Sequence, residues 1–250
     1  MFKKEFKNTF MKLLKPYGYV YCSKLNYFVK VLNGELLFFI GYWFQPSGAP
    51  GYRCFTIVCG CTSLYFTSLE KDGIEMSECR LHEFDVMNEQ GDRYDLQYDF
   101  LFRVDDKEEI KNSISESFTS LEIVALPILE KIVDLNSYIE YKKKRDIGTI
   151  RLCEIFLYDS LVLIKADNHD DFLDVYNAAV DRLKKLYDKG IAGGDFEEEK
   201  SKTYMGVVER IAGSRDKVYA DPELYKKALE EADRRKKANT ELLRSYGIDI

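Results

Sequence analysis

The stretch KLNYFVKVLNGELLFFIGYWF, residues 24–44, decides the fold. Two runs of aromatic and β-branched residues flank Asn33-Gly34, and both of these turn residues tolerate the positive φ angles that a tight hairpin requires. Both runs carry apolar residues on both faces, so we expect at least one of the two strands to be covered on two sides. The stretch therefore predicts a hairpin within an antiparallel sheet.

Neighbouring stretches extend this sheet. YGYVYC, residues 17–22, predicts a short strand before the hairpin. RCFTIVCGCTSLYF, residues 53–66, predicts one long strand or two short strands divided at Gly60, because glycine inside a strand often marks a bulge. Residues 70–98 are irregular, with one further strand expected near residues 79–84. The sequence thus predicts an antiparallel sheet of four to five strands.

Helices are expected on both sides of the strands in the sequence. Residues 2–14 predict an amphipathic helix that Pro16 ends, and its apolar side should pack on the sheet. The expected apolar stripe consists of Phe2, Phe6, Leu13 and Leu14. Asp106 can cap a second, long helix, with Glu109 as its capping-box partner. Pro127 should kink or restart that helix.

From about residue 134 the sequence predicts helices only. The first, residues 135–141, is closed by the charge run KKKRD. Residues 150–165 are apolar nearly all round and are expected to form a buried helix, with a pair of strands as the alternative. The last begins at Asp221-Pro222-Glu223, with aspartate at the cap and proline at the first helical position, and runs to about Arg244. The fold class is therefore α+β: an α+β domain over residues 1–135, followed by a helical C-terminal extension over residues 136–250 packed on it.

Composition and charge exclude some function classes. The chain has 250 residues and a formal net charge of −6, which argues against a nucleic-acid binder. Its longest apolar run, residues 36–44, is too short to cross a membrane as a helix, so no membrane insertion is expected. The N-terminus lacks the continuous apolar core of a signal peptide. We therefore expect a cytoplasmic protein in which the six cysteines are thiols.

Three cysteines, Cys54, Cys59 and Cys61, lie within one predicted strand. Structural zinc sites typically use close C-x2-C pairs, and the spacings here are C-x4-C and C-x-C. Because side chains alternate along a strand, Cys59 and Cys61 would share one face and Cys54 the other. The pattern favours core cysteines over a metal site.

The sequence contains no recognisable catalytic motif. It has neither a P-loop nor a G-x-G-x-x-G fingerprint, and we expect no cofactor, no metal site and no catalytic residue. The enzymatic alternative places a site of unknown class near Cys59, Cys61 or His82, where His82-Glu83-Phe84-Asp85 is the richest small polar cluster. A second alternative is nucleic-acid binding through Lys142–Arg145 beside Tyr138 and Tyr141.

Aromatic residues flank the loop QPSGAPG, residues 45–51. Tyr42, Trp43 and Phe44 precede it and Tyr52 follows it. Aromatic side chains beside a surface loop are typical binding anchors, although core aromatics at a strand end would give the same pattern. We therefore take these four residues as the candidate binding site for another protein.

The N-terminal half resembles the bacterial domain-of-unknown-function family numbered 4304. The matching motifs are LLKPYGYVYCSKLNYFVKV, residues 13–31, and ALPILEKI, residues 125–132, and the resemblance covers roughly residues 1–135. Where the family prefers Gly-Phe, this chain has Gly18-Tyr19. The resemblance implies an α+β fold and no established activity. Related small bacterial domains often occur beside toxin systems, so it also implies an immunity-like role as a non-enzymatic protein-binding module.

Overall fold

A computed structural model describes residues 1–65, 69, 79–81, 84, 97–147, 165, 217, 218 and 220–250. The chain divides into two compact units. The first comprises Met1–Leu64, Ser68–Tyr138 and Ala238–Ile250, and the second comprises Tyr65–Thr67 and Ile139–Lys237. The C-terminal residues from Ala238 onward therefore belong to the same unit as the N-terminus.

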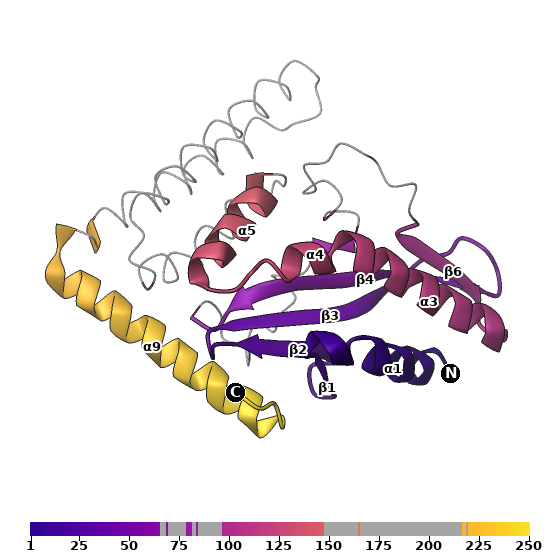
Figure 1. Cartoon of the computed structure of the whole chain (residues 1–250), viewed down its shortest axis with the longest axis horizontal. Coiled ribbons are helices and arrows are strands. Elements are labelled where there is room, and N and C mark those ends of the chain that lie inside the picture. The colour runs from indigo at the N-terminus through magenta and orange to yellow at the C-terminus, as the bar shows by residue number, and fades with distance from the viewer. Residues whose placement is uncertain are drawn as a thin grey trace, which may run out of the picture. The chain divides into compact units, whose positions relative to one another are not determined.

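The first unit is built on an antiparallel sheet, which confirms the predicted α+β class (Figure 1). Among the described residues the sheet has six strands in the order β1-β2-β3-β4-β5, with β6 pairing with β4 beside β5. Their bounds are Val20–Cys22 for β1, Tyr27–Leu32 for β2, Leu36–Gln45 for β3, Tyr52–Ser63 for β4, Cys79–Arg80 for β5 and Asp99–Arg103 for β6.

The predicted hairpin joins β2 to β3. Asn33 and Gly34 have φ angles of 53° and 63°, the left-handed region that their residue types tolerate. The turn is closed by a hydrogen bond that the Glu35 N–H donates to the carbonyl of Leu32 (3.0 Å). The hairpin prediction is therefore confirmed, turn chemistry included.

Strand β4 is continuous, so Gly60 does not divide it. Its pairing with β3 runs without a break from Leu36–Ser63 to Gln45–Cys54, and Gly60 lies opposite Phe39. The interior of this strand is packed against neighbours on both sides. One strand, β6, was not expected from the sequence, although Phe100 and Phe102 alternate with exposed residues in the manner of a half-buried strand.

Within the described residues the helices lie close to their expected positions, whereas the segment 150–165, except for Lys165, lies outside the described residues. Their bounds are Phe2–Leu13 for α1, Lys107–Val124 for α3, Leu126–Leu129 for α4, Leu135–Ile147 for α5 and Pro222–Ser245 for α9, with a short 3-10 turn at Lys15–Tyr17. Pro127 lies in the first turn of α4 and restarts the helix after Ala125, as predicted. The prediction that the charge run closes α5 is wrong, because α5 continues through it to Ile147. Among the described residues, no helix combines the length and apolar character needed to cross a bilayer.

Helix α1 covers one face of the sheet with three phenylalanines. Phe2, Phe6 and Phe10 are buried, and the ring of Phe2 lies 4.8 Å from that of Phe55 on β4. The predicted packing of α1 on the sheet is confirmed, but its predicted stripe needs one correction. Leu13 is 37% exposed, and Phe10 lies in the stripe instead. The reason is the helical period, since Phe2, Phe6 and Phe10 repeat every four residues.

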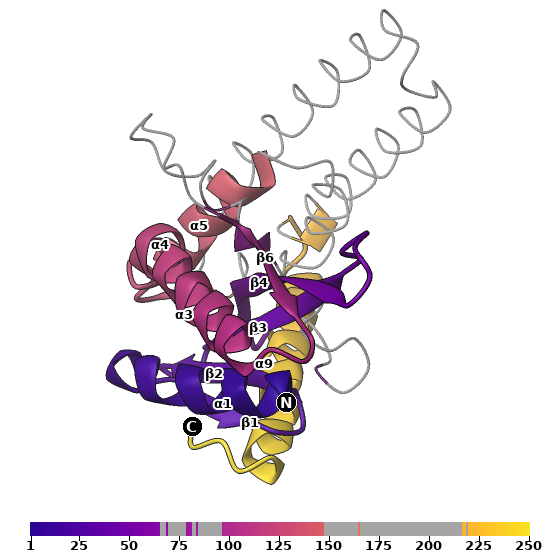
Figure 2. The ribbon, with the colours of Figure 1, turned by 90° about the vertical axis from the view of Figure 1, so that its right-hand side faces the viewer.

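The opposite face of the sheet is covered at one end by the C-terminal residues of the same unit (Figure 2). Cys22, Val29, Leu37 and Phe39 form a buried cluster there with Leu64, Leu69, Leu243 and Ile248. Figure 2 shows α1 and α3 on one side of the strands and the last turns of α9 on the other. The sheet of the first unit therefore has α1 and α3 on one face and, at one end, the C-terminal residues on the other.

The start of α3 is capped by Asp106, as predicted. Its carboxylate accepts hydrogen bonds from the backbone N–H groups of Glu108 and Glu109 (2.9 and 3.0 Å). The capping-box role of Glu109 is wrong, because its carboxylate accepts from the N–H of Arg103 (2.7 Å) and not from the cap residue. Glu109 therefore ties the helix to the end of β6.

Replacing Asp106 with alanine should lower the free energy of unfolding by about 1 kcal/mol, the usual cost of removing a helix cap. The Glu108 and Glu109 N–H groups would lose their acceptor. Chemical denaturation of the full chain measures the change. An Asp106→Asn variant keeps an acceptor and should fall between the two proteins. Equal stability of the alanine variant and the original protein would refute the cap.

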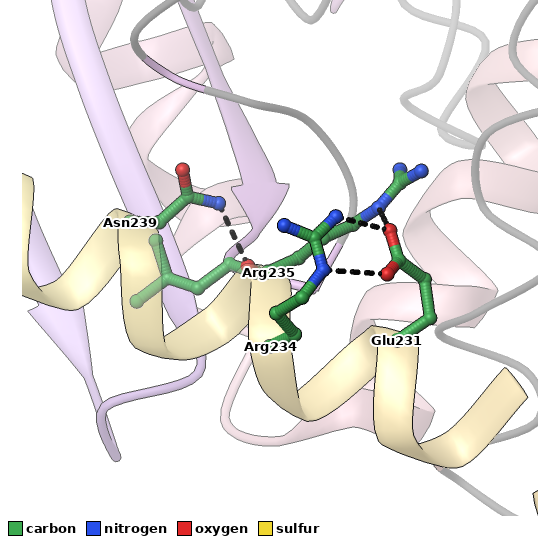
Figure 3. A network of polar contacts seen from close by, with 5 residues as sticks. Glu231, Arg234, Arg235 and Asn239 are labelled. Carbon is green, nitrogen blue, oxygen red and sulfur yellow. Dashed lines mark hydrogen bonds and ion pairs between the residues drawn. The ribbon is translucent and has the colours of Figure 1, made fainter. Parts of the chain in front are cut away.

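In the second unit, Glu231 on α9 binds two arginines. Arg234 Nε and Arg235 Nε donate to its two carboxylate oxygens at 2.7 and 2.8 Å. Figure 3 shows both guanidinium groups turned toward this carboxylate. These hydrogen bonds lower the pKa of Glu231 from 4.5 to about 2, and the bond from Arg234 has the larger effect of the two.

This low pKa predicts a pH dependence. Because the folded pKa lies below the ordinary value, the contribution of Glu231 to stability is present above about pH 4.5 and is lost as the pH falls toward 2. Carboxyl chemical shifts recorded by NMR from pH 7 to pH 2 should place the titration midpoint of Glu231 near pH 2. In an Arg234→Gln, Arg235→Gln variant its pKa should rise toward 4.5. A midpoint near 4.5 in the unmodified protein would contradict the network.

Candidate functional site

Strand alternation divides the four predicted binding residues between two faces of the sheet. Tyr42 and Phe44 lie on the face that α1 covers, with their rings 4.9 and 5.1 Å from the ring of Phe2. The Tyr42 hydroxyl is buried and has no hydrogen-bond partner among the described residues, and burial raises the pKa of this phenol. Trp43 lies on the opposite face. Tyr42 therefore contributes to the aromatic core, whereas Phe44 packs against Phe2 on that face and is still 40% exposed.

Trp43 and Tyr52 share the other face. Trp43 pairs with Thr56 of β4, so both side chains lie on the same face. Tyr52 lies four residues before Thr56 on the same strand, and residues an even number of positions apart share a face. Cys54, between them on this side, pairs with Leu101 of β6. Trp43, Tyr52 and Leu101 are 37%, 36% and 46% exposed. We call these three residues the outer patch.

The outer patch lies on strands that are fastened to one another by side chains. Gln45 Nε2 donates to Asp99 Oδ1 (3.0 Å), which joins the ends of β3 and β6. Thr56 Oγ1 donates to the carbonyl of Tyr98 (3.0 Å), next to the start of β6. These bonds add to the backbone ladder. The patch is consequently presented by a fixed platform rather than by a loop.

Arginines border the outer patch. The Arg80 guanidinium lies 5.6 Å from the centre of the Trp43 ring. Arg103 lies opposite Tyr52 in the pairing of β4 with β6 and binds Asp105 at 3.3 Å. The hydrogen bond and charge of Asp105 raise the pKa of Arg103, which stays cationic.

The backbone edge of β6 beyond the patch is occupied. The Val104 N–H donates to the carbonyl of Gly51, so Leu101 and Arg103 direct their backbone groups away from β4. Ser113 Oγ donates to the Leu101 carbonyl (2.8 Å), and Glu109 accepts from the Arg103 N–H. A partner strand could not pair with these groups, so contact through the face is favoured over strand addition.

The described cysteines do not form a reactive site. Cys59 and Cys61 are fully buried. The pKa of Cys54 is raised by burial and by the charge of Asp99, which disfavours the reactive thiolate. Within the described ranges, no group of three or more His, Cys, Asp or Glu residues could hold a metal ion. His82, the third residue of the enzymatic alternative, lies outside the described residues.

The basic run of the nucleic-acid alternative lies within α5. Lys142 is buried, with 6% of its surface exposed, and Tyr138 and Tyr141 are buried as well. The side chains of Lys143, Lys144 and Arg145 lie outside the description. The first lysine of the run, at least, is not on an open surface that a nucleic acid could bind.

Sequence reasoning missed Leu101 and Arg80. Leu101 lies in the unpredicted strand β6, and Arg80 lies in a strand of two residues. The alternation in DFLFR, residues 99–103, was the available signal for β6. The place of Arg80 depends on its pairing with Val58, which no local pattern indicates.

No family model, no curated protein and no solved structure matches the chain. The resemblance of residues 1–135 to the family numbered 4304 therefore stays a prediction.

Proposed function

We propose that the protein is a non-enzymatic binding module and that the outer patch docks another protein. The observation that carries this proposal is the exposure of Trp43, Tyr52 and Leu101 together on one face of a hydrogen-bonded sheet. Tryptophan and tyrosine are enriched among the residues that dominate interface energies. The remaining half of this sheet face packs against the C-terminal residues, whereas the patch has large apolar side chains exposed to solvent.

The chemistry of the surrounding residues supports binding over catalysis. The only described thiol near the patch, that of Cys54, has a raised pKa. The nearby Asp99 is engaged by Gln45. Among the described residues no hydrogen bond joins the Cys54 thiol to the Asp99 carboxylate, so the two are not arranged as a nucleophile and its base.

An immunity-like role is the finer form of this proposal, and it rests on the family resemblance alone. In that case the partner would be an enzyme whose activity falls when the complex forms. Measuring the activity of a captured partner with and without this protein tests that form separately. A partner whose activity is unaffected would reject the immunity-like role and leave the docking proposal intact.

Replacing Trp43 with alanine should raise the dissociation constant of the complex about 30-fold, because a central tryptophan anchor typically contributes about 2 kcal/mol or more. The tagged full chain is used to capture the partner from its own cells. The purified partner is then titrated by calorimetry against the original protein and the Trp43→Ala variant.

An Ile123→Ala variant serves as the control. Ile123 is as exposed as Trp43 but lies on α3, and its loss should leave affinity unchanged. Circular dichroism shows whether both variants keep their fold. Equal affinity of the folded Trp43→Ala variant and the original protein would refute the site.

A further inference from the structure

We infer that the partner of the outer patch presents carboxylates beside apolar side chains, so that it is an acidic protein segment. This inference rests on the proposed function and adds the chemistry of the partner. It starts from Arg80, an exposed residue on β5. Arg80 pairs with Val58, two residues beyond Thr56, so it lies on the same sheet face as Trp43.

Arg80 is held beside the patch by the indole ring. Its guanidinium lies 5.6 Å from the centre of the Trp43 ring, within the range of a cation–π contact. No ion pair engages Arg80 within the part of the chain that the structure describes. A guanidinium that rests on an aromatic ring keeps its N–H fork available, and this fork matches a carboxylate in bidentate geometry.

The two described carboxylates that lie near the patch have other partners. Asp99 accepts from Gln45, and Asp105 binds Arg103. Among the described residues, Arg80 is therefore the arginine beside the patch that no carboxylate binds. A carboxylate of the partner would form an ion pair with Arg80. Such a pair is weak in open solvent, and its burial under the docked partner would strengthen it.

The charge of Arg80 is opposite in sign to the net charge of the whole chain. A net charge of −6 would favour a basic partner at long range. Contacts within a docked interface lie well inside the screening distance of about 8–10 Å, so the local Arg80 decides which groups fit there. The acidic balance of the chain instead limits the rate of association with an acidic partner, which added salt should relieve.

A protein segment fits the patch better than a nucleic acid does. Nucleic-acid binding surfaces neutralise several phosphates with rows of lysine and arginine. The outer patch is bordered by two arginines, Arg80 and the already paired Arg103, and this is not a row of cations that could follow a phosphate backbone. The apolar side chain of Leu101 likewise offers a contact for apolar residues of a protein.

The test is selection of peptides from a displayed library of random 12-residue sequences on the immobilised full chain. Peptides rich in Asp or Glu beside apolar residues should be enriched. Their affinity should fall at least tenfold on Arg80→Glu and on Trp43→Ala. The matched control is Arg53→Glu, because Arg53 rests on Phe44 at 5.4 Å but lies on the face that α1 covers. That variant should bind the peptides as the original protein does.

Three other results would overturn the inference, and they separate it from the proposed function. Peptides without acidic residues that need Trp43 but tolerate Arg80→Glu would refute the acidic partner and keep the docking site. Selected peptides that bind Trp43→Ala undiminished would refute both. A 20-nucleotide single-stranded DNA that binds more tightly than any peptide, and loses binding on Arg80→Glu, would assign the patch to nucleic acid.

Discussion

Replacing Phe10 with alanine should lower the free energy of unfolding by about 3–5 kcal/mol, the range for removing a buried phenylalanine. Phe10 is fully buried, and its ring lies 4.0 Å from that of Phe6 in a stacked arrangement. It also meets the ring of Phe118 edge-on at 5.5 Å, which links α1 to α3. The substitution would leave a cavity where two helices and the sheet meet, and urea denaturation of the full chain measures the loss.

Leu13 provides a matched control one turn further along α1. Its side chain is 37% exposed, so Leu13→Ala should change stability by no more than about 0.5 kcal/mol. If the two variants were equally destabilised, the helix would present a different side to the sheet from the one described here. If neither were destabilised, α1 would not pack on the sheet at all.

Replacing Asn239 with leucine should lower the free energy of unfolding by about 2–6 kcal/mol, because two buried backbone groups would lose their partners at about 1–3 kcal/mol each. The buried Asn239 side chain accepts from the N–H of Leu69 (3.0 Å) and donates to the carbonyl of Leu64 (2.9 Å). Figure 3 shows the amide of Asn239 on α9, with its hydrogen bond drawn. This residue joins the last turns of α9 to the end of β4 within the first unit.

Glu241→Leu is the control for this substitution, since Glu241 is exposed on the same helix. It introduces the same side chain without removing a buried hydrogen bond and should leave stability nearly unchanged. Native-state hydrogen exchange adds a local measurement, because the Leu69 N–H should exchange faster in Asn239→Leu. A slow Leu69 N–H in that variant would contradict the bond.

The local features of the fold could be predicted because their causes are local. The hairpin follows from two residues, Asn33 and Gly34, that tolerate positive φ. The start of α9 follows from Asp221, whose carboxylate accepts from the Glu223 N–H (2.9 Å). The restart at Pro127 follows from the missing N–H of proline. In each case the deciding contact lies within a few residues.

Other features depend on contacts between distant residues. Glu109 fits a capping box by spacing, yet the neighbouring end of β6 supplies a competing donor, the N–H of Arg103. The C-terminal residues join the first unit through Asn239 and Leu243, which pack against residues far away in the sequence. No periodicity within α9 specifies this target.

The candidate site could be predicted only where its residues are marked by the local sequence. Trp43 and Tyr52 were found because aromatics beside a turn-rich loop are visible in the sequence. Alternation along β3 removes Tyr42 and Phe44 from that surface, and this could have been deduced from the strand itself. Arg80 and Leu101 reach the patch through strand pairing with β4, which the sequence does not reveal.

Site-specific photocrosslinking in the protein's own cells tests the central claim most directly. A benzophenone side chain is introduced at Leu101 in one protein and at Ile123 in another, positions that are both exposed but lie on β6 and α3. The account predicts that irradiation joins a single acidic protein to position 101 and that Trp43→Ala abolishes this product. A product at position 123 with none at position 101 would contradict the account, because the partner would then dock on the opposite side of the sheet.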